Sequence, residues 1–258
     1  MSGTDDGAPR TLVCIPTYNE AESVRTVVSR VRSARPEVDV LVVDDDSPDG
    51  TGAIADGLAA ADAQVLVLHR TEKAGLGVAY LAAFAWGLQH GYDVIVEMDA
   101  DGSHRAQDLE PLLDAVAGGA DLALGSRWMR GGRVENWSRH RRWLSRGGNI
   151  YARLMLRVPV TDATGGFRAF RAAALTELDL RDVASHGYCF QVDLVRRAHD
   201  HGLSIVEVPI VFVEREFGIS KMSGGIVTEA LWRVTVWGIQ RRLRHLVHRV
   251  ARRPAPTG

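Results

Sequence analysis

Asp99 and Asp101 are the first side chains whose types and spacing indicate chemistry, because two carboxylates one residue apart can approach one divalent cation. They stand at the end of the apolar run 92–100, which has the composition of a buried strand. Carboxylate oxygens are hard ligands that suit Mg²⁺ or Mn²⁺, which also bind phosphate groups. Many surface loops carry an Asp-x-Asp pair, so its place after a strand is what favours a metal site. The competing interpretation is that Asp101 or Ser103 caps a helix predicted over 105–118.

A second acidic cluster, Asp44–Asp46 with Asp49, follows another apolar run. Its spacing fits the Asp-Asp-x-x-Asp pattern of isoprenoid synthases, which bind magnesium diphosphate from a helix. Here the carboxylates follow a strand, and Pro48 disfavours a helical conformation of the residue before it. In other nucleotide-binding folds an acidic residue after the second strand bonds to a ribose, which favours Asp45 as a nucleoside ligand. Asp49 is better explained by the turn that begins a helix over 51–61.

The elements that must position these residues follow from the hydrophobic pattern. Short apolar runs predict strands at 11–16, 38–45, 63–70, 92–100 and 120–127. Apolar residues at helical spacing predict helices at 20–34, 51–61, 77–90 and 105–118. Strands that are apolar on both faces and alternate with helices indicate an α/β fold, a mostly parallel sheet with helices on both faces. Ligands of such sheets bind outside the carboxyl ends of the strands, where the polar segments of this sequence collect.

The second half of the chain has a less regular pattern. Residues 128–150 mix Trp, Arg and Gly, and residues 162–170 indicate a turn followed by a short strand. Later patterns predict a helix at 187–201, a strand at 204–215 and a long helix at 226–250 that ends basic. The first strand leads into PTYNE rather than G-x-G-x-x-G, which argues against a Rossmann dehydrogenase.

The composition excludes some classes of protein. The 258 residues are 46% hydrophobic, enough for a sizeable core, and the net charge of −1 gives no overall basic field for nucleic acid. The only cysteines, Cys14 and Cys189, fit the role of small core residues in a reduced, intracellular protein. No apolar run approaches the roughly 20 residues of a membrane-spanning helix.

Several motifs together make the sequence resemble a known family. In order, they are IPTYNE, VVDDDSPDGT, MDADGSH, GSR, GGRVENW and REFGISK. Over roughly 11–225 the chain resembles the family 2 glycosyltransferases of the Rossmann-like GT-A fold, and within them the dolichol-phosphate or polyprenol-phosphate mannosyltransferases. The resemblance implies transfer of mannose from GDP-mannose to a polyprenyl monophosphate with inversion, assisted by Mg²⁺ or Mn²⁺. An acceptor phosphate with a second pKa of about 6 is already ionised, so no strong general base is required.

The resemblance also implies roles for individual residues. The nucleotide pocket is expected to include Pro16, Tyr18, Glu20, Val43 and Asp45. The metal and diphosphate are expected to meet Asp99, Ala100, Asp101 and Ser103, the last standing where relatives often carry Gln. Phosphate groups of the donor or acceptor are expected to contact Arg127, Arg215 and Lys221. The catalytic residues would be Asp101, Arg127 and Arg215, and the acceptor-binding residues Arg127, Arg141 and Ser145.

The expected organisation follows from the same resemblance. A disordered N-terminus (1–9) precedes a GT-A catalytic domain (10–225), a C-terminal amphipathic helix (226–250) and a disordered tail (251–258). Near Ser145 the family places an interfacial helix, where Trp128, Trp137 and Trp143 among arginines suit a lipid headgroup surface. Core tryptophans beside solvated arginines are the competing interpretation. We expect a peripheral protein on the cytoplasmic face of a membrane, with a separate transmembrane subunit as an additional partner.

Two further functions stay open at this point. The same fold and site could use another donor, such as UDP-glucose. The chain could also be a non-catalytic subunit that binds a nucleotide sugar. The intact Asp-x-Asp pair and the cationic residues argue for a catalyst, and a panel of donors would decide the sugar.

Overall fold

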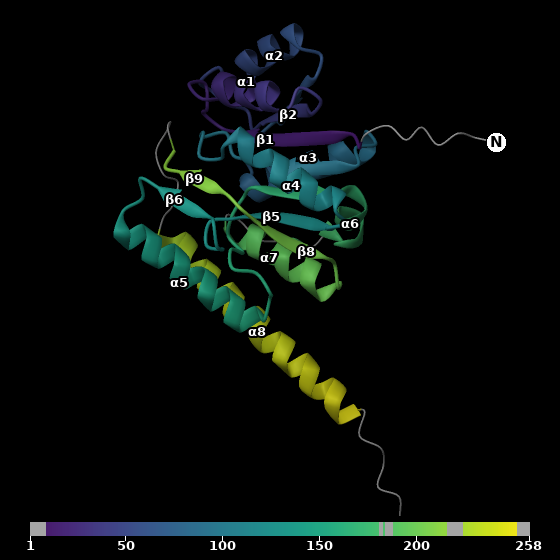
Figure 1. Ribbon diagram of the computed structural model, residues 1–258, viewed down its shortest axis with the longest axis vertical. Coiled ribbons are helices and arrows are strands. Elements are labelled where there is room, and N and C mark those ends of the chain that lie inside the picture. The colour runs from purple at the N-terminus through teal and green to yellow at the C-terminus, as the bar shows by residue number, and fades with distance from the viewer. Residues whose placement is uncertain (1–8, 181–182, 184–187, 216–223, 252–258) are drawn as a thin grey trace, which may run out of the picture.

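The computed structural model describes residues 9–180, 183, 188–215 and 224–251 (Figure 1). Lys221, which the sequence predicts to bind phosphate, lies outside these residues. The first half contains β1 (Thr11–Thr17), α1 (Val24–Ala34), β2 (Asp39–Asp44), α2 (Thr51–Ala61), β3 (Val65–His69), α3 (Leu76–Gln89), β4 (Val94–Glu97), the 3₁₀ turn η1 (Ala106–Asp108), α4 (Leu109–Ala117) and β5 (Leu122–Ser126). The second half contains β6 (Arg133–Glu135), α5 (Arg139–Leu156), β7 (Arg168–Arg171), α6 (Ala172–Glu177), α7 (Tyr188–Asp200), β8 (Ile205–Pro209), β9 (Val211–Val213) and α8 (Gly224–Ala251).

A central sheet of seven strands, in the order β3-β2-β1-β4-β7-β5-β8, is formed by the described residues. Strands β1, β2, β3 and β4 pair in parallel, as do β5 and β8, and only β7 runs antiparallel to its neighbours. The expected mostly parallel sheet is therefore confirmed. The chain moves outward from β1 to β3 and then returns to β4 on the other side of β1. Such a reversal of strand order opens a crevice at the carboxyl ends of β1 and β4, which is where ligands bind in open α/β sheets.

Both faces of the sheet are covered because the strands are apolar on both sides. Along β1, Leu12 and Cys14 pack into a core with α3, α5 and α7, whereas Val13 and Ile15 pack against α1 and α4. The apolar face of α1 is buried, as its spacing predicts. Regular alternation of this kind needs only local sequence information.

Residues 127–160 form the part that periodicity did not predict. Strand β6 pairs in parallel with β9 in a separate two-stranded sheet. The long helix α5 begins at an N-cap, Ser138, whose side chain accepts a hydrogen bond from the amide of Arg141. Helix α5 buries Asn149, Ala152 and Leu156, while Trp143, Ile150 and Leu154 are exposed.

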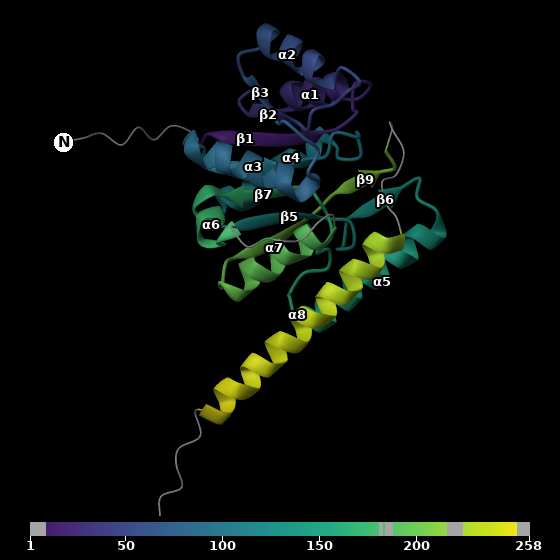
Figure 2. The same ribbon diagram turned by 180° about the vertical axis from the view of Figure 1, so that it is seen from behind.

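Helices α5 and α8 lie side by side, and the end of α8 extends beyond the rest of the molecule (Figures 1 and 2). The hydroxyls of Tyr151 and Thr235 are 2.6 Å apart, and a Cβ on Gly238 would lie 2.9 Å from the carbonyl oxygen of Met155. Glycine is therefore required for this close helix contact. No helix among the described residues combines the length and the apolar character that crossing a membrane requires.

Candidate active site

Asp99 and Asp101 lie at the carboxyl end of β4, next to Arg215 from the segment after β9. The Arg215 guanidinium is 3.5 Å from Asp101 Oδ2. Asp101 Oδ1 accepts hydrogen bonds from the backbone amide and, at 2.5 Å, from the hydroxyl of Ser103. On the other side, the Tyr80 hydroxyl donates to Asp99 Oδ1 at 3.3 Å. The two carboxylates are thus held from several directions, by residues far apart in the sequence.

His104 fixes the backbone at the base of this loop. Its Nδ1 accepts a hydrogen bond from the Asp99 amide at 3.1 Å, so the proton of the neutral ring is on Nε2. The ring is buried and stacks on Phe167, with its edge toward Phe212. Burial lowers the pKa of His104 to about 4, which keeps the ring neutral near pH 7.

The electrostatics of the loop suit a cation. Burial, and then the neighbouring charge of Asp101, raise the pKa of Asp99 to about 7. A bound divalent ion would remove this repulsion. In the described part of the chain, no group of three or more Asp, Glu, His or Cys side chains forms a ready metal cluster. The two carboxylates of Asp99 and Asp101 could hold Mg²⁺ or Mn²⁺ if phosphate oxygens of a substrate complete the coordination.

Ser103, which the sequence predicts as a further metal ligand, is bonded to Asp101. Its side chain is buried, and the hydroxyl is directed at Asp101 rather than at open space. In this arrangement Ser103 orients the carboxylate. Ala100, between the two aspartates, is buried and offers only its backbone to a ligand.

The residues expected at the nucleotide lie at the carboxyl ends of β1 and β2. Pro16 pairs with Val43 across the two strands, and both are buried. Asp45 follows β2 and is 4% exposed, and the Arg70 guanidinium donates to its Oδ1 at 2.6 Å. Burial raises the pKa of Asp45, and the charge of Arg70 opposes this shift. Arg70 is a partner of Asp45 that sequence reasoning missed.

Tyr18 and Glu20 lie in the segment that follows β1. The ammonium of Lys73 lies over the Tyr18 ring, 3.8 Å from its centroid. Glu20 accepts a hydrogen bond from the Ser23 hydroxyl at 3.0 Å, while its amide donates to the Thr51 hydroxyl. The loops after β1, β2 and β3 therefore meet at one edge of the sheet.

The remaining carboxylates of the acidic cluster organise the turn after β2. Asp44 Oδ1 accepts from the hydroxyls of Ser47 and Thr17, at 2.6 and 3.0 Å. Asp49 accepts from the amides of Ala21 and Thr51, so it ties this turn to the preceding loop and to the first residue of α2. Asp44 and Asp49 therefore stabilise the turn. Asp46, in the same turn, has a positive φ of 57°.

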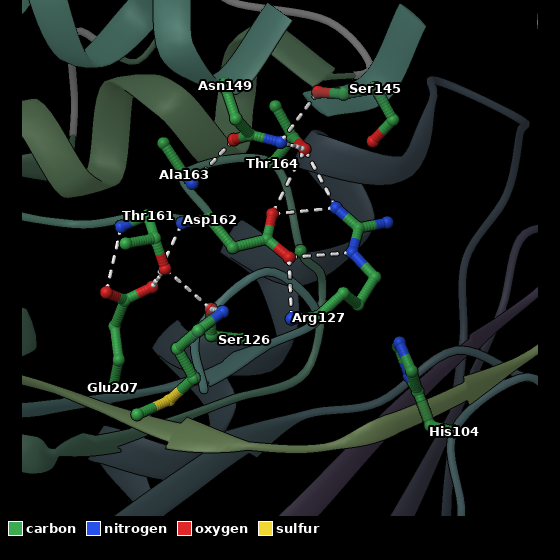
Figure 3. Close-up of polar contacts among 12 residues, drawn as sticks. His104, Ser126, Arg127, Ser145, Asn149, Thr161, Asp162, Ala163, Thr164 and Glu207 are labelled. Atoms are coloured by element: carbon green, nitrogen blue, oxygen red, sulfur yellow. Dashed lines mark hydrogen bonds and ion pairs between the residues drawn. The ribbon is translucent and has the colours of Figure 1, made fainter. Parts of the chain in front are cut away.

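Arg127, at the end of β5, lies in a buried network with Asp162 (Figure 3). Its Nε and Nη2 donate to the two Asp162 oxygens, each at 2.7 Å, and Nη2 also donates to the Thr164 hydroxyl. Burial alone would raise the pKa of Asp162, but the Arg127 charge outweighs it and holds the pKa below its usual range. Arg127 was expected on phosphate, and this paired, 5% exposed position differs from an open phosphate ligand.

Strands β5 and β8, helix α5 and the loop 161–164 meet around this pair (Figure 3). Asn149 of α5 donates to Thr164 and accepts from the Ala163 amide. Glu207 of β8 accepts from the amides of Thr161 and Asp162. The Ser126 hydroxyl is 2.9 Å from that of Thr161. Asn149 and Glu207 carry no motif of their own, and only the tertiary structure brings them to Arg127.

The two other residues expected at the acceptor lie on α5. Arg141 donates to Glu214 at 2.9 Å, and its guanidinium lies 4.0 Å from the centroid of the Trp137 ring. Ser145 lies one turn before Asn149, whose side-chain amide nitrogen donates to the Ser145 carbonyl oxygen. The Arg127 guanidinium is 5.6 Å from the same Trp137 ring, which links the two arginines through one aromatic side chain.

Comparison with known proteins places this site in a family. The pattern of the family described as "Glycosyl transferase family 2" matches residues 12–179. The chain is 58% identical to the "Polyprenol monophosphomannose synthase" of Mycolicibacterium smegmatis, over 91% of this chain and 89% of that protein. It is 57% identical to the "Undecaprenyl-phosphate mannosyltransferase" of Micrococcus luteus, over 90% of this chain and 96% of that protein. It is 34% identical to a "Dolichol-phosphate mannosyltransferase" of Pyrococcus furiosus, over 87% of this chain and 63% of that protein.

Solved structures with low sequence identity share the fold. Glucosyl-3-phosphoglycerate synthase of Mycobacterium tuberculosis, in complex with Mn²⁺, UDP-glucose and phosphoglyceric acid, is 18% identical, with a TM-score of 0.68 over 89% of this chain and 80% of that one. A mannosyltransferase of Pyrobaculum calidifontis, in complex with GDP-Man and Mn²⁺, is 20% identical, with a TM-score of 0.55 over 97% and 78%. These likenesses confirm the expected GT-A fold.

Proposed function

Because the chain belongs to glycosyl transferase family 2, we propose that it transfers mannose from GDP-mannose to a polyprenyl monophosphate with inversion. The product would be a polyprenyl β-mannosyl phosphate, a lipid-linked mannose donor for glycoconjugates or proteins. The observation that carries the proposal is the Asp99–Asp101 pair beside Arg215, on a chain 58% identical to a protein named as a polyprenol monophosphomannose synthase. Of the metal ions, Mg²⁺ and Mn²⁺ both suit the oxygen ligands.

Asp99 and Asp101 would hold the cation, which when bound supplies charge neutralisation for the diphosphate leaving group. Tyr80, Ser103 and His104 keep the two carboxylates and their loop in place, as the hydrogen bonds above describe. Arg215 adds a positive charge next to Asp101, where negative charge would build up on the departing diphosphate. The Ala100 backbone lies between the two ligands.

The acceptor phosphate is its own nucleophile, so the site needs cations rather than a base. Its oxygen would attack the anomeric carbon on the face opposite the departing diphosphate, and ionisation with a second pKa of about 6 leaves it deprotonated near pH 7. We assign Arg127, Arg141 and Ser145 to the acceptor phosphate. Since Asp162 holds Nε and Nη2 of Arg127, the guanidinium is already oriented, and the positive charge that it brings to the acceptor loses little freedom on binding.

The nucleoside would bind at the edge formed by the loops after β1, β2 and β3. Asp45, oriented by Arg70, is assigned to the guanosine, with Val43, Pro16, Tyr18 and Glu20 around it. Lys221 keeps its predicted role at the phosphates.

Because a polyprenyl phosphate resides in a membrane, the protein would act peripherally on its cytoplasmic face, with or without a transmembrane partner subunit. The catalytic domain over 10–225 and the C-terminal helix over 226–250 remain our proposed division of the chain.

The decisive experiment is a panel of nucleotide sugars with one polyprenyl phosphate and either Mg²⁺ or Mn²⁺. We expect turnover with GDP-mannose and little with other donors. Preferred use of UDP-glucose would replace the proposed donor but keep the enzyme class. Calorimetric binding of GDP-mannose without any turnover would favour the non-catalytic subunit and overturn the proposal.

A further inference from the structure

Gln191, near the start of α7, is a buried amide that the protein itself does not use. The residue is 3% exposed. Among the residues that the structure describes, neither its Nε2 nor its Oε1 has a hydrogen-bonding partner. A glutamine amide offers two N–H donors and one carbonyl acceptor, and leaving these groups buried and unpaired costs folding free energy. Such a group calls for an explanation, and a ligand that pairs with it is one.

Gly166 leaves a space between Gln191 and the carboxylate of Asp99. A Cβ atom on Gly166 would lie 3.5 and 3.6 Å from the two Asp99 oxygens and 3.7 Å from Gln191 Nε2. These are ordinary van der Waals distances, so the space accepts one group of about the size of a methyl. We call this space, bounded by Asp99 and Gln191, the Gly166 cradle. A single group bound there would touch both the carboxylate and the amide.

The buried Arg168 fixes the shape of the cradle. Its guanidinium donates to the carbonyl oxygens of Ala163 and Gly165, each at 2.8 Å. It also donates to the backbone carbonyl oxygen of Gln191 at 2.8 Å. One side chain thus ties the loop that contains Gly166 to the first turns of α7. The two walls are already in place, so a ligand that enters between them loses little free energy to ordering the protein.

Glu97 is the group inside the protein that could compete for Gln191. It is fully buried, and its Oε2 lies 3.9 Å from Nε of Arg168. Burial raises the pKa of Glu97 to about 8, against the smaller opposite effects of Arg168 and then Gln191. A hydrogen bond to Glu97 would use one N–H of the amide and leave the other for a ligand. The Glu97 side chain therefore does not remove the need for a further partner.

A sugar hydroxyl has the size and the hydrogen-bonding pattern that the cradle requires. It can donate to the Asp99 carboxylate and accept from an N–H of Gln191 at the same time. An oxygen at the Cβ position would be slightly too far from both for good hydrogen bonds, and small side-chain rotations would bring them into reach. The Asp99 side chain is 31% exposed. A substrate that meets this carboxylate from solvent therefore has the cradle beside it.

We propose that Gln191 binds a hydroxyl of the donor sugar in the Gly166 cradle and so determines which sugar the protein accepts. The inference rests on the proposed function, because it takes a nucleotide sugar to be bound at Asp99 and Asp101. A hexose with that hydroxyl in the opposite configuration would leave the cradle empty and the amide unpaired. Sites that contain a buried polar group discriminate strongly against substrates that do not satisfy it.

The test uses calorimetry with Mn²⁺ to compare the affinities for GDP-mannose and for GDP, whose difference is the contribution of the sugar. Gln191→Met keeps the length of the side chain but removes its amide. We expect the affinity for GDP-mannose to fall about tenfold and the affinity for GDP to stay the same. The preference for GDP-mannose over GDP-glucose in the transfer assay should fall as well. The unfolding midpoint should not fall, because the change removes an unpaired buried group.

Gly166→Ala tests the cradle itself, because the new methyl group would occupy it. Gly166 does not have the positive φ that would strain an alanine, and the contacts of the added Cβ are ordinary. We expect this variant to fold and to bind GDP normally, but to lose most of the contribution of the sugar. The matched control is Gly57→Ala on the exposed side of α2, where no described atom lies within 4 Å of the added Cβ. This control should change neither affinity.

Three results would overturn the inference. If Gln191→Met bound GDP-mannose as tightly as the unaltered protein does, a buried water would be the better partner for the amide. Equal weakening of GDP and GDP-mannose binding, or a clearly lower unfolding midpoint of Gln191→Met, would show that Gln191 acts on the structure rather than on the sugar. Normal sugar binding by Gly166→Ala would show that the cradle is not occupied.

The same measurements separate this inference from the proposed function. If the unaltered protein binds GDP-mannose but transfers nothing, the proposed function fails alone, and the binding comparison still decides the role of Gln191. If the donor panel selects UDP-glucose, the comparison is made with UDP-glucose and UDP. Transfer from GDP-mannose with an unchanged sugar contribution in Gln191→Met overturns this inference alone.

Discussion

The turn after β2 and the network around Arg127 each bury a carboxylate, Asp44 in the turn and Asp162 in the network, but they are built in different ways. In the turn, Asp44 and Asp49 bond to Ser47 and Thr51, two or three residues away, and also to Thr17 and Ala21, 27 and 28 residues away. In the network, Asp162 and Glu207 bond to partners 35 to 46 residues away. The turn combines short-range bonds, whose closure costs little, with bonds to the end of β1 and the loop that follows it. The network joins β5, α5, β8 and the loop 161–164, and it excludes water from its charges. The following changes test this comparison.

The largest effect is expected at the site that both regions serve. Asp101→Ala should lower the rate of mannose transfer by about a thousandfold or more, because it removes a charged group at the leaving diphosphate. Asp46→Asn is the matched control, since this exposed residue has a positive φ that Asn tolerates. If Asp46→Asn lost as much activity as Asp101→Ala, the assignment of the metal site to Asp99 and Asp101, and of Asp46 to the turn alone, would be contradicted.

Breaking the distant network should cost stability as well as activity. Asp162→Asn leaves the Arg127 charge buried without its counter-charge, which should lower the free energy of unfolding by about 3–5 kcal/mol. Asp56→Asn breaks an exposed pair with His69 and should change the free energy of unfolding by less than about 0.5 kcal/mol. Denaturant unfolding measures both, and similar small losses would show that the network is not a structural unit.

The same pair predicts a dependence on pH. The pKa of Asp162 is lowered in the folded protein, so the unfolded chain takes up this proton at a higher pH than the folded protein does. The stability that the ionised carboxylate contributes is therefore lost as the pH falls through the folded pKa. The stability difference between the unaltered protein and Asp162→Asn should be constant above the ordinary Asp pKa of about 3.9 and shrink below it. A difference that grows in acid would have the wrong sign.

The smallest effect is expected in the turn. Asp49→Ala removes the acceptor for the amides of Ala21 and Thr51 and should cost about 1 kcal/mol of folding stability. Asp49→Asn keeps one acceptor oxygen and should recover part of that loss. If Asp49→Ala were as damaging as Asp162→Asn, the turn would not be the more local of the two structures.

Much of the fold could be predicted because its signals are local. The strand and helix patterns in the first half match β1 to β5 and α1 to α4, and the Asp-x-Asp pair lies at the predicted sheet edge. Strand β6 and helix α5 were not predicted from periodicity, since α5 is apolar on an exposed side and buries Asn149. The resemblance did place an interfacial helix in this region.

The sequence by itself determined the α/β alternation, the polar edge and the residue types that can meet a cation and phosphates. These properties depend on neighbours within a few positions, so the chain states them directly. Only the tertiary structure decided that Arg70 pairs with Asp45, that Arg127 is held by Asp162, and that α5 packs against α8. Those pairings join residues from separate elements, and their identity follows from sheet order and helix packing rather than from any spacing along the chain.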